Sequence, residues 1–523
     1  MKLRKSFIFL VLCISFLLLA ACTEGTAKPS TNNNTSSDPK SNDSANVKRD
    51  IVIAVEGDAV TMLANTDVNY VNDVQIRNIY DALIMREPNG DFIPGLATDW
   101  RNVDELTWEF KLREGVKFHN GAPFNAEAVK YNIDYILNPN NNSFYLSRWE
   151  MMEEAIVVDE YTIQIKTKQP FPNLLLRIAD DLLVMEPGHV EEVGFDVAAR
   201  NPVGTGPYKF VEWSRDSFLK LESFDDYWQG KPEIETLTFR YIPEFGSRLS
   251  AFLSGDVDLF KNVPVDSTER IENDKDSNIA SIASSRINYL ALNNFHEGPL
   301  QDKRVRQAIN YVVDVDELIA TVLNGFGTKM TGPLSELNEG YTQTNDYGYN
   351  PDKAVELLKE AGYEPSELKL QLDTPSGRYP MDTQIAQAIA IQLERIGINV
   401  TVQVNEWGNH LAKIRQREMG DMFILGWGPA LDAQGTIEAL FTNTAPYSGF
   451  YTPEMEKEIQ AAIPVFEPTA RKAAFDEIQH LIVEEAAWVP LWQQADLYAV
   501  REGLFFEPRI DERYSVFNMK WNK

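Results

Sequence analysis

Helical and strand patterns alternate along the second half of this chain. Residues 351–362 and 382–397 carry apolar side chains three and four positions apart, and each segment ends on a glycine, as helices commonly do. The segments 398–404 and 421–427 instead have the apolar and β-branched character of strands. This rhythm predicts a mixed sheet covered by helices and places the chain in the α/β class.

Three further segments extend the pattern. Residues 302–323 have helical spacing, whereas residues 486–500 return to a strand pattern near the C-terminus. In the first half, residues 155–165 predict a β-hairpin that turns at Asp159 and Glu160, because apolar residues alternate on both sides of this acidic pair.

The size of the chain indicates how many lobes it forms, and its charge indicates which partners it can bind. A body running from about residue 50 to residue 523 exceeds what one hydrophobic core organises, so we expect two or more lobes. The 78 acidic residues outnumber the 49 basic residues and give a formal net charge of −29. Such a surface repels the phosphates of nucleic acids and anionic lipids, so we expect no nucleic-acid partner.

The N-terminus has the layout of an export signal. Three basic residues among the first five precede an uncharged apolar run over residues 6–21. The run is short for a membrane span, which needs about 20 apolar residues. A retained anchor helix is the alternative, but the two alanines that end the run are typical of a cleavage site. We therefore expect residues 1–21 to be a signal peptide.

The four residues from Leu19 to Cys22 resemble the lipobox of bacterial lipoproteins. By that resemblance, Cys22 becomes the lipidated first residue of the mature chain. The other cysteine, Cys13, lies in the segment that would be removed, so the mature chain forms no internal disulfide. Residues 23–46 are mostly polar and contain no apolar run. We expect residues 22–49 to be a lipid anchor and a flexible tether.

Common signatures of catalysis and metal binding are absent from the sequence. It contains no G-x-S-x-G elbow, no H-E-x-x-H zinc helix and no G-x-x-x-x-G-K-[ST] phosphate loop. No two of its five histidines are four positions apart, so we expect neither a zinc site nor a cofactor. Nothing singles out a catalytic carboxylate pair among the 78 acidic residues, although a surface hydrolase stays open as an alternative.

Two motifs in the first half are interpreted as structural. Gly204 and Gly206 flank Thr205 and permit a tight backbone path beside a strand. His119, in the sequence FHNG, is interpreted as a packed or turn-stabilising histidine in preference to a metal or substrate ligand.

Six segments together resemble the extracellular solute-binding proteins of peptide- and nickel-type ABC transporters, known as family 5. The resemblance covers nearly the whole mature chain, and its specificity comes from the segments occurring together. The segments are LREGVKFHNGAPFNAEAVKYNI (112–133), NPVGTGPYKFVEW (201–213), YWQGKPEIETLTFRYIPE (227–244), SGDVDLF (254–260), ALNNFHEGPLQDKRVRQAINYVVD (291–314) and EEAAWVPLW (484–492).

The resemblance implies a two-lobed periplasmic-binding-protein-like fold of type II, with the ligand cleft between the lobes. Lobe I is expected over residues 50–290, with an extra subdomain inserted at about 85–199. Lobe II is expected over residues 291–494, and the C-terminal segment 495–523 is expected to return to lobe I.

The resemblance also implies a function. The chain would capture a small peptide or peptide-like solute, such as glutathione or a di- or oligopeptide, by lobe closure, and deliver it to the permease subunits of an ABC importer. We expect an extracytoplasmic monomer that is held at the cell membrane by its lipid anchor and is not an enzyme. Nickel or a metal chelate is the alternative ligand, and an adhesive or chaperone-like lipoprotein is an alternative of another class.

Four residues near the expected cleft are candidates for ligand contact. The family position favours Arg378 as the anchor of a ligand carboxylate, because its planar guanidinium forms two parallel hydrogen bonds; an ordinary surface residue is the alternative. Trp407 and Trp427 either offer an aromatic face to the ligand or pack in the core. Tyr80 lies on the apolar face of a predicted helix and either packs there or contacts the ligand.

The loop after Trp427 departs from the pattern of the peptide-binding relatives. They carry an aspartate three residues after the loop tryptophan, which pairs with the α-ammonium group of the ligand, whereas this chain has Ala430. Asp432 is expected to serve instead, with capping of the next helix as its alternative role. Nickel-binding relatives are expected to carry a histidine where this chain has Gln434, which disfavours nickel. A ligand with differently spaced charges, such as glutathione, is therefore favoured over generic dipeptides.

Overall fold

The computed structural model describes residues 48–66, 70–428 and 432–522. These residues belong to one unit that runs from Val47 to Lys523. The expected signal peptide, the lipidation site Cys22 and Ala430 lie outside the described residues, as does nearly all of the expected tether.

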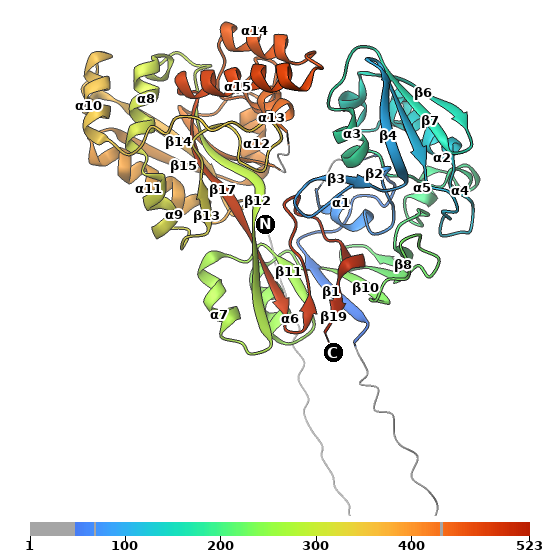
Figure 1. Cartoon of the computed structure of the whole chain (residues 1–523). Helices are drawn as coiled ribbons and strands as arrows, with labels where there is room; N and C mark the ends of the chain where they lie inside the picture. Colours follow the sequence, from blue (N-terminus) through green and yellow to red (C-terminus); the bar gives the residue numbers. More distant parts are fainter. Residues whose placement is uncertain (1–47, 67–69, 429–431, 523) are drawn as a thin grey trace, which may run out of the picture. The chain divides into compact units, whose positions relative to one another are not determined.

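Two long antiparallel strands, β12 (Ser277–Leu292) and β17 (Trp488–Arg501), run through the middle of an eleven-stranded sheet (Figure 1). The strand order is β15-β14-β16-β12-β17-β11-β1-β10-β9-β8, and β13 (Gly327–Lys329) pairs with β17. The strands beyond β12 are β16 (Met422–Trp427), β14 (Lys369–Pro375) and β15 (Asn399–Asn405). The strands beyond β17 are β11 (Leu259–Lys261), β1 (Asp50–Val55), β10 (Thr236–Tyr241), β9 (Phe218–Ser223) and β8 (Tyr208–Ser214).

The pairing between β12 and β17 is irregular near its midpoint. The register shifts between Ala283 and Ile287, which leaves residues 284–286 outside the ladder of the two strands. A hydrogen bond from a side chain replaces part of the ladder there. The Ser284 hydroxyl donates to the backbone carbonyl of Gln494 at 3.1 Å. A break of this kind bends a strand locally. The two halves of the large sheet are therefore joined through a bent pair of strands.

Helices cover both faces of the half-sheet beyond β12. Met422 and Ile424 of β16 belong to one apolar core, whereas Phe423 and Leu425 belong to another, as the alternation of a strand requires. The first core includes residues of α8 (Lys303–Val312), α10 (Pro351–Glu360) and α11 (Asp382–Arg395). The second includes residues of α13 (Ala433–Phe441), α14 (Pro453–Ala462) and α15 (Pro468–Glu484). The predicted mixed sheet covered by helices is confirmed.

The helices predicted at residues 351–362 and 382–397 are confirmed as α10 and α11. The helical spacing of residues 302–323 is confirmed, but the segment forms two helices, α8 and α9 (Val315–Thr321). Asp314 separates them, and its side chain accepts a hydrogen bond from the backbone N–H of Glu317 at 2.9 Å. This N-cap starts a new helix at a point where the apolar spacing of the sequence runs on without a break.

A second sheet of four antiparallel strands lies in the first half of the chain, in the order β4-β5-β7-β6. The predicted hairpin is confirmed by β6 and β7, although its turn lies at Glu160 and Tyr161, one residue later than expected, because Asp159 still pairs with Thr162. The strands are β4 (Ala97–Asp104), β5 (Thr107–Leu112), β6 (Met152–Asp159) and β7 (Thr162–Thr167). The remaining elements of this half are α1 (Tyr70–Ile76), β2 (Ile84–Arg86), β3 (Phe92–Pro94), α2 (Ala126–Leu137), α3 (Leu174–Asp181), α4 (Pro187–Val193), α5 (Phe195–Ala198), α6 (Phe245–Leu253) and α7 (Thr268–Glu272).

The motif around Gly204 and Gly206 has the structural role that the sequence indicates. A Cβ atom added at Gly206 would lie 2.6 Å from the carbonyl carbon of Ile79, and one added at Gly204 would also collide with the Ile79 carbonyl. The His119 side chain lies beside the same turn, with Nε2 2.9 Å from the carbonyl oxygen of Gly206. Burial lowers the pKa of His119 to about 4, so this histidine is neutral and packed.

The C-terminal segment contacts residues from the beginning of the described chain. After β17 it forms the short hairpin of β18 (Leu504–Phe505) and β19 (Lys520–Trp521). The Trp521 indole N–H donates to the backbone carbonyl of Asp50 at 3.0 Å. Arg513 forms ion pairs with Asp73 at 2.8 Å and with Asp180 at 3.1 Å. These contacts fix the segment against both α1 and α3.

Candidate functional site

The loop that carries Arg378 is held by one aspartate. It follows β14, and the Asp382 carboxylate, at the start of α11, accepts hydrogen bonds from the backbone N–H groups of Gly377, Arg378 and Tyr379 at 3.1, 2.9 and 3.2 Å. Gly377 has a φ angle of +73°, which an L-residue rarely adopts. The local sequence therefore fixes the backbone from which the Arg378 side chain projects.

Arg378 and Trp407, both predicted binding residues, lie together. The Arg378 guanidinium carbon is 5.3 Å from the centroid of the Trp407 ring and 5.2 Å from that of Tyr379, within the range of cation–π attraction. Trp407 begins α12 (Trp407–Arg415) and is half-buried. Arg378 is exposed, and among the described residues no side chain or carbonyl forms a hydrogen bond or ion pair with its guanidinium. Aromatic rings thus orient a cation that has no hydrogen-bond partner among the described residues.

Trp427 ends β16 beside this loop. It is half-buried, pairs with Ile287 of β12, and its ring centroid lies 5.6 Å from that of Tyr447. The next residue, Gly428, leaves room for β12, because a Cβ atom there would lie 2.8 Å from the Cα atom of Arg286. Trp427 therefore packs at the edge of an apolar core next to the irregular part of β12. Its role in ligand contact stays a prediction.

A buried network of four charged residues lies at the same irregular region. Lys261, at the end of β11, forms ion pairs with Asp496 of β17 at 2.9 Å and with Glu512 of the C-terminal segment at 2.6 Å. Glu512 also pairs with Arg286 of β12 at 3.1 Å. Burial raises the pKa of Glu512, but Arg286 and Lys261 outweigh it and hold the pKa at about 2. The network connects both long strands, β11 and the C-terminal segment through one ionised carboxylate.

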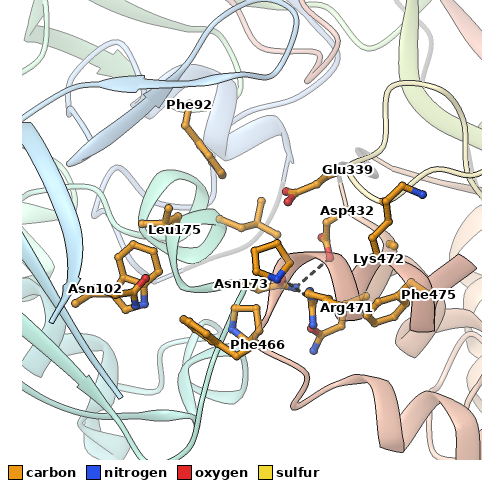
Figure 2. A pocket seen from close by; sticks show the side chains of 17 residues that line it. Phe92, Asn102, Asn173, Leu175, Glu339, Asp432, Phe466, Arg471, Lys472 and Phe475 are labelled. Atoms are coloured by element: carbon orange, nitrogen blue, oxygen red, sulfur yellow. Dashed lines mark hydrogen bonds between the residues drawn. The ribbon is translucent and has the colours of Figure 1, made fainter. Parts of the chain in front are cut away.

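Asp432 borders a cavity of about 490 Å³, a volume that suits a small organic ligand (Figure 2). Its walls come from β3, β4, β5 and the start of α3 on one side, and from α13 and α15 on the other. Apolar side chains make up much of the lining: Phe92, Trp108, Leu175, Leu176, Phe466 and Phe475. The polar groups include Asn173, Glu339, Asp432 and Arg471. Arg378, Trp407 and Trp427 do not line this cavity.

Asp432 is the N-cap of α13, which confirms the capping role that the sequence offered as its alternative. Its Oδ1 atom accepts from the backbone N–H of Gly435 at 2.8 Å and from Nδ2 of Asn173 at 3.0 Å. No hydrogen bond to Oδ2 is found among the described residues. One carboxylate oxygen thus serves the fold, and the ligand role of Asp432 stays a prediction.

Gln434, the position discussed for nickel, is buried and forms two side-chain hydrogen bonds. Its Nε2 atom donates to Glu438 at 3.0 Å, and its Oε1 atom accepts from Arg471 Nη2 at 2.6 Å. Within the described parts of the chain, no three His, Cys, Asp or Glu side chains are grouped so that they could hold a metal ion.

Tyr80 does not lie on a helix, so the predicted helical position is wrong. Helix α1 ends at Ile76, and Tyr80 follows in a turn where its ring is 2 % exposed. Its hydroxyl donates to the carbonyl of Met62 at 3.0 Å, and burial raises its pKa. Packing is therefore its observed role. Tyr80 also borders a second cavity of about 320 Å³, in which the nearby Arg86 is already paired with Asp180.

Two residues that the sequence did not single out join the elements around the first cavity. Asn173 precedes α3 and bonds to Asp432 and to Arg471, whose Nη2 donates to Asn173 Oδ1 at 3.0 Å. An asparagine directly before a helix is ordinarily interpreted as a cap, so nothing in the sequence indicates a contact with residues so far along the chain.

In the part of the chain that the structure describes, no helix has the length and apolarity needed to cross a membrane.

Comparisons with known proteins decide the family. Residues 91–448 match the model of bacterial extracellular solute-binding proteins, family 5, middle region. This chain belongs to that family. The chain is also 30 % identical over 461 residues to the glutathione-binding protein GsiB of Pectobacterium atrosepticum, which covers 84 % of this chain and 88 % of the relative. The GsiB protein of Salmonella typhi is 29 % identical over 462 residues, with 85 % and 88 % covered.

Solved structures of other binding proteins share the fold. The substrate-binding protein CtaP of Listeria monocytogenes superimposes with a TM-score of 0.84 at 22 % identity, over 91 % of this chain and 100 % of that one. The protein DppA of Helicobacter pylori, solved with the peptide STSA, gives a TM-score of 0.75 at 25 % identity, over 91 % and 99 %. NikZ of Campylobacter jejuni, solved with Ni(L-His), gives a TM-score of 0.77 at 21 % identity, over 90 % of this chain and 99 % of that one. The two-lobed periplasmic-binding-protein fold is confirmed, and the family is one of binding proteins.

Proposed function

We propose that this chain is the solute-binding lipoprotein of an ABC importer and that its ligand is a small peptide or peptide-like solute such as glutathione. The observation that carries the proposal is the Arg378 guanidinium, which Trp407 and Tyr379 orient and which forms no hydrogen bond or ion pair with a described side chain. A guanidinium held in this way is suited to a ligand carboxylate, because its planar fork makes two parallel hydrogen bonds. The relatives named glutathione-binding proteins support this class of ligand.

The two ends of the ligand would meet groups of opposite charge. Arg378 would hold a carboxylate, and the Oδ2 atom of Asp432 would accept from an ammonium group while Oδ1 caps α13. Trp427 would offer its exposed face between them. Glutathione carries two carboxylates and one ammonium group, so these anchors would hold one of its carboxylates and its ammonium group.

Lobe closure would take place at the irregular part of β12 and β17. We place lobe I at residues 50–290, lobe II at 291–494 and the returning segment at 495–523, so both long strands cross from one lobe to the other. A ladder break at residues 284–286 supports bending there, because fewer backbone bonds resist it. The protein would act as an extracytoplasmic monomer, hold no cofactor, and deliver the enclosed solute to the permease subunits.

The first prediction concerns the ligand. Reduced glutathione at 100 times its dissociation constant is expected to stabilise the soluble chain lacking residues 1–22 by about 2.7 kcal/mol, because it binds only the folded form. Thermal unfolding with glutathione, with the dipeptide Met-Leu and with nickel plus L-histidine compares the candidate ligands. Mass spectrometry of the incubated glutathione checks that no product forms. Stabilisation only by nickel–histidine would overturn the peptide-like ligand, and product formation would favour a hydrolase.

The second prediction concerns anchorage. Replacing Cys22→Ser removes the thiol that would carry the lipid, so the protein is expected to leave the membrane fraction or to accumulate as uncleaved precursor. Cell fractionation followed by mass measurement of the N-terminus checks this, with Cys13→Ser as the matched control that keeps normal processing. A processed Cys22→Ser protein that still fractionates with membranes would contradict the assignment.

A further inference from the structure

Asn173 occupies the N-cap position of α3, yet its side chain does not cap that helix. Asparagine is a favoured N-cap because its side-chain oxygen accepts a free backbone N–H of the first turn. Here the amide instead reaches two partners that follow it by 259 and 298 residues. Nδ2 donates to Asp432 Oδ1 at 3.0 Å, and Oδ1 accepts from Arg471 Nη2 at 3.0 Å (Figure 2).

The polarity of the amide matches both partners. Its N–H group faces a carboxylate and its carbonyl oxygen faces a guanidinium, so both hydrogen bonds involve a charged group and are stronger than neutral ones. Each partner is held in place by a second contact. Asp432 caps α13 through Gly435, and Arg471 of α15 also donates to Gln434 Oε1 at 2.6 Å. The amide therefore meets a preformed pair of opposite charges.

The bonds cross the 490 Å³ cavity from one wall to the other. Asn173 lies before α3, in the part of the chain that we assign to lobe I, whereas Asp432 and Arg471 belong to the helices that cover β16 in lobe II. All three side chains are half-buried, so water is displaced from the contact only in part. Such a contact can form only when the two walls approach each other.

We propose that Asn173 is a latch that holds the two lobes together and slows the release of bound ligand. The latch uses Asp432 Oδ1, and no hydrogen bond to Oδ2 is found among the described residues, so latch and ligand would not compete for the same oxygen. The effect on ligand release rests on the proposed function, whereas the contact between the lobes does not. Because the bonds must break before the lobes separate, the latch slows the dissociation of an enclosed ligand.

Two substitutions separate a latch from a packing role. Asn173→Ala removes both bonds and is expected to raise the dissociation rate of glutathione about ten-fold, which is about 1.4 kcal/mol. Asn173→Asp keeps the size of the side chain and an acceptor for Arg471, but it replaces the donor to Asp432 with a second carboxylate, so its dissociation is also expected to be faster than that of the wild type. Asn140→Ala is the matched control, because Asn140 is an exposed asparagine that lines neither of the two cavities.

Stopped-flow tryptophan fluorescence with reduced glutathione measures the dissociation rate, and small-angle scattering of the ligand-free proteins measures the radius of gyration. The latch is supported if both Asn173 variants release glutathione faster than the wild type and Asn140→Ala, or if both have a larger radius of gyration than these two proteins. If the wild type does not bind glutathione, the proposal of glutathione as ligand fails. Small-angle scattering is then the only measurement that tests the latch. The latch is overturned if the Asn173 variants have the radius of gyration of the wild type and, where glutathione binds, also its dissociation rate. An Asn173→Asp protein with both the radius and the dissociation rate of the wild type overturns it as well.

Discussion

Replacing Glu512→Ala is expected to lower the free energy of unfolding by about 3–5 kcal/mol. Glu512 is the carboxylate that neutralises both Lys261 and Arg286, and the side chains of these three residues are 4–6 % exposed. Without it, Arg286 loses its ion pair to Glu512, and Lys261 keeps its ion pair to Asp496, whose pKa burial raises despite the nearby lysine. The loss of a carboxylate from two buried cations costs more than the cavity alone.

Urea unfolding followed by tryptophan fluorescence and by circular dichroism measures the loss. Glu507→Ala is the matched control, because Glu507 lies in the same C-terminal segment with an exposed side chain, and its change is expected to stay within about 0.5 kcal/mol. Glu512→Gln, which keeps the shape and a hydrogen-bonding oxygen, is expected to fall between the two. An unfolding midpoint for Glu512→Ala equal to that of Glu507→Ala would show that the network does not stabilise the fold.

The alternating patterns of the second half predicted most of lobe II because periodicity reports which side of an element is buried. Helices α10 and α11 and strand β16 have the expected positions, since their apolar residues face the two cores. The pattern failed at Asp314, where a polar cap divides one apolar repeat into two helices without interrupting its spacing. It failed again at Tyr80, because apolar residues in a buried turn carry the same signal as the face of a helix.

The candidate site was predicted in part. Arg378 and Trp407 were predicted as ligand-contact residues with the help of the family resemblance, and the structure shows them in contact with each other. Asn173, Arg471 and Glu512 could not be predicted, because each acts through partners hundreds of residues away, and a single sequence contains no record of such pairings. A buried ion pair and an exposed one also look alike in composition, so the charged network at the long strands is visible only in three dimensions.

The largest effect on ligand binding is expected from Arg378→Ala. If this guanidinium holds a ligand carboxylate, its removal leaves a charged group unpaired in a cleft from which water is largely excluded, and the affinity for glutathione is expected to fall by about 2–5 kcal/mol. Arg378→Lys is expected to recover only part of the loss, because an ammonium group is a point charge and cannot make two parallel hydrogen bonds. Trp407→Leu keeps the arginine but removes the ring that orients it, so its loss is expected to be smaller, about 0.5–2 kcal/mol.

Titration calorimetry with reduced glutathione measures these losses, and thermal unfolding without ligand verifies that each variant is folded. Arg270→Ala is the matched control, since Arg270 is an exposed arginine of α7 and is expected to bind like the wild type. If the affinity for glutathione rises from Arg378→Ala to Arg378→Lys to the wild type, the arginine binds a carboxylate through two parallel hydrogen bonds. A purely electrostatic role would make lysine nearly equivalent to arginine at this position. A folded Arg378→Ala protein that binds glutathione with wild-type affinity would remove Arg378 from the site while leaving the capture of glutathione itself established.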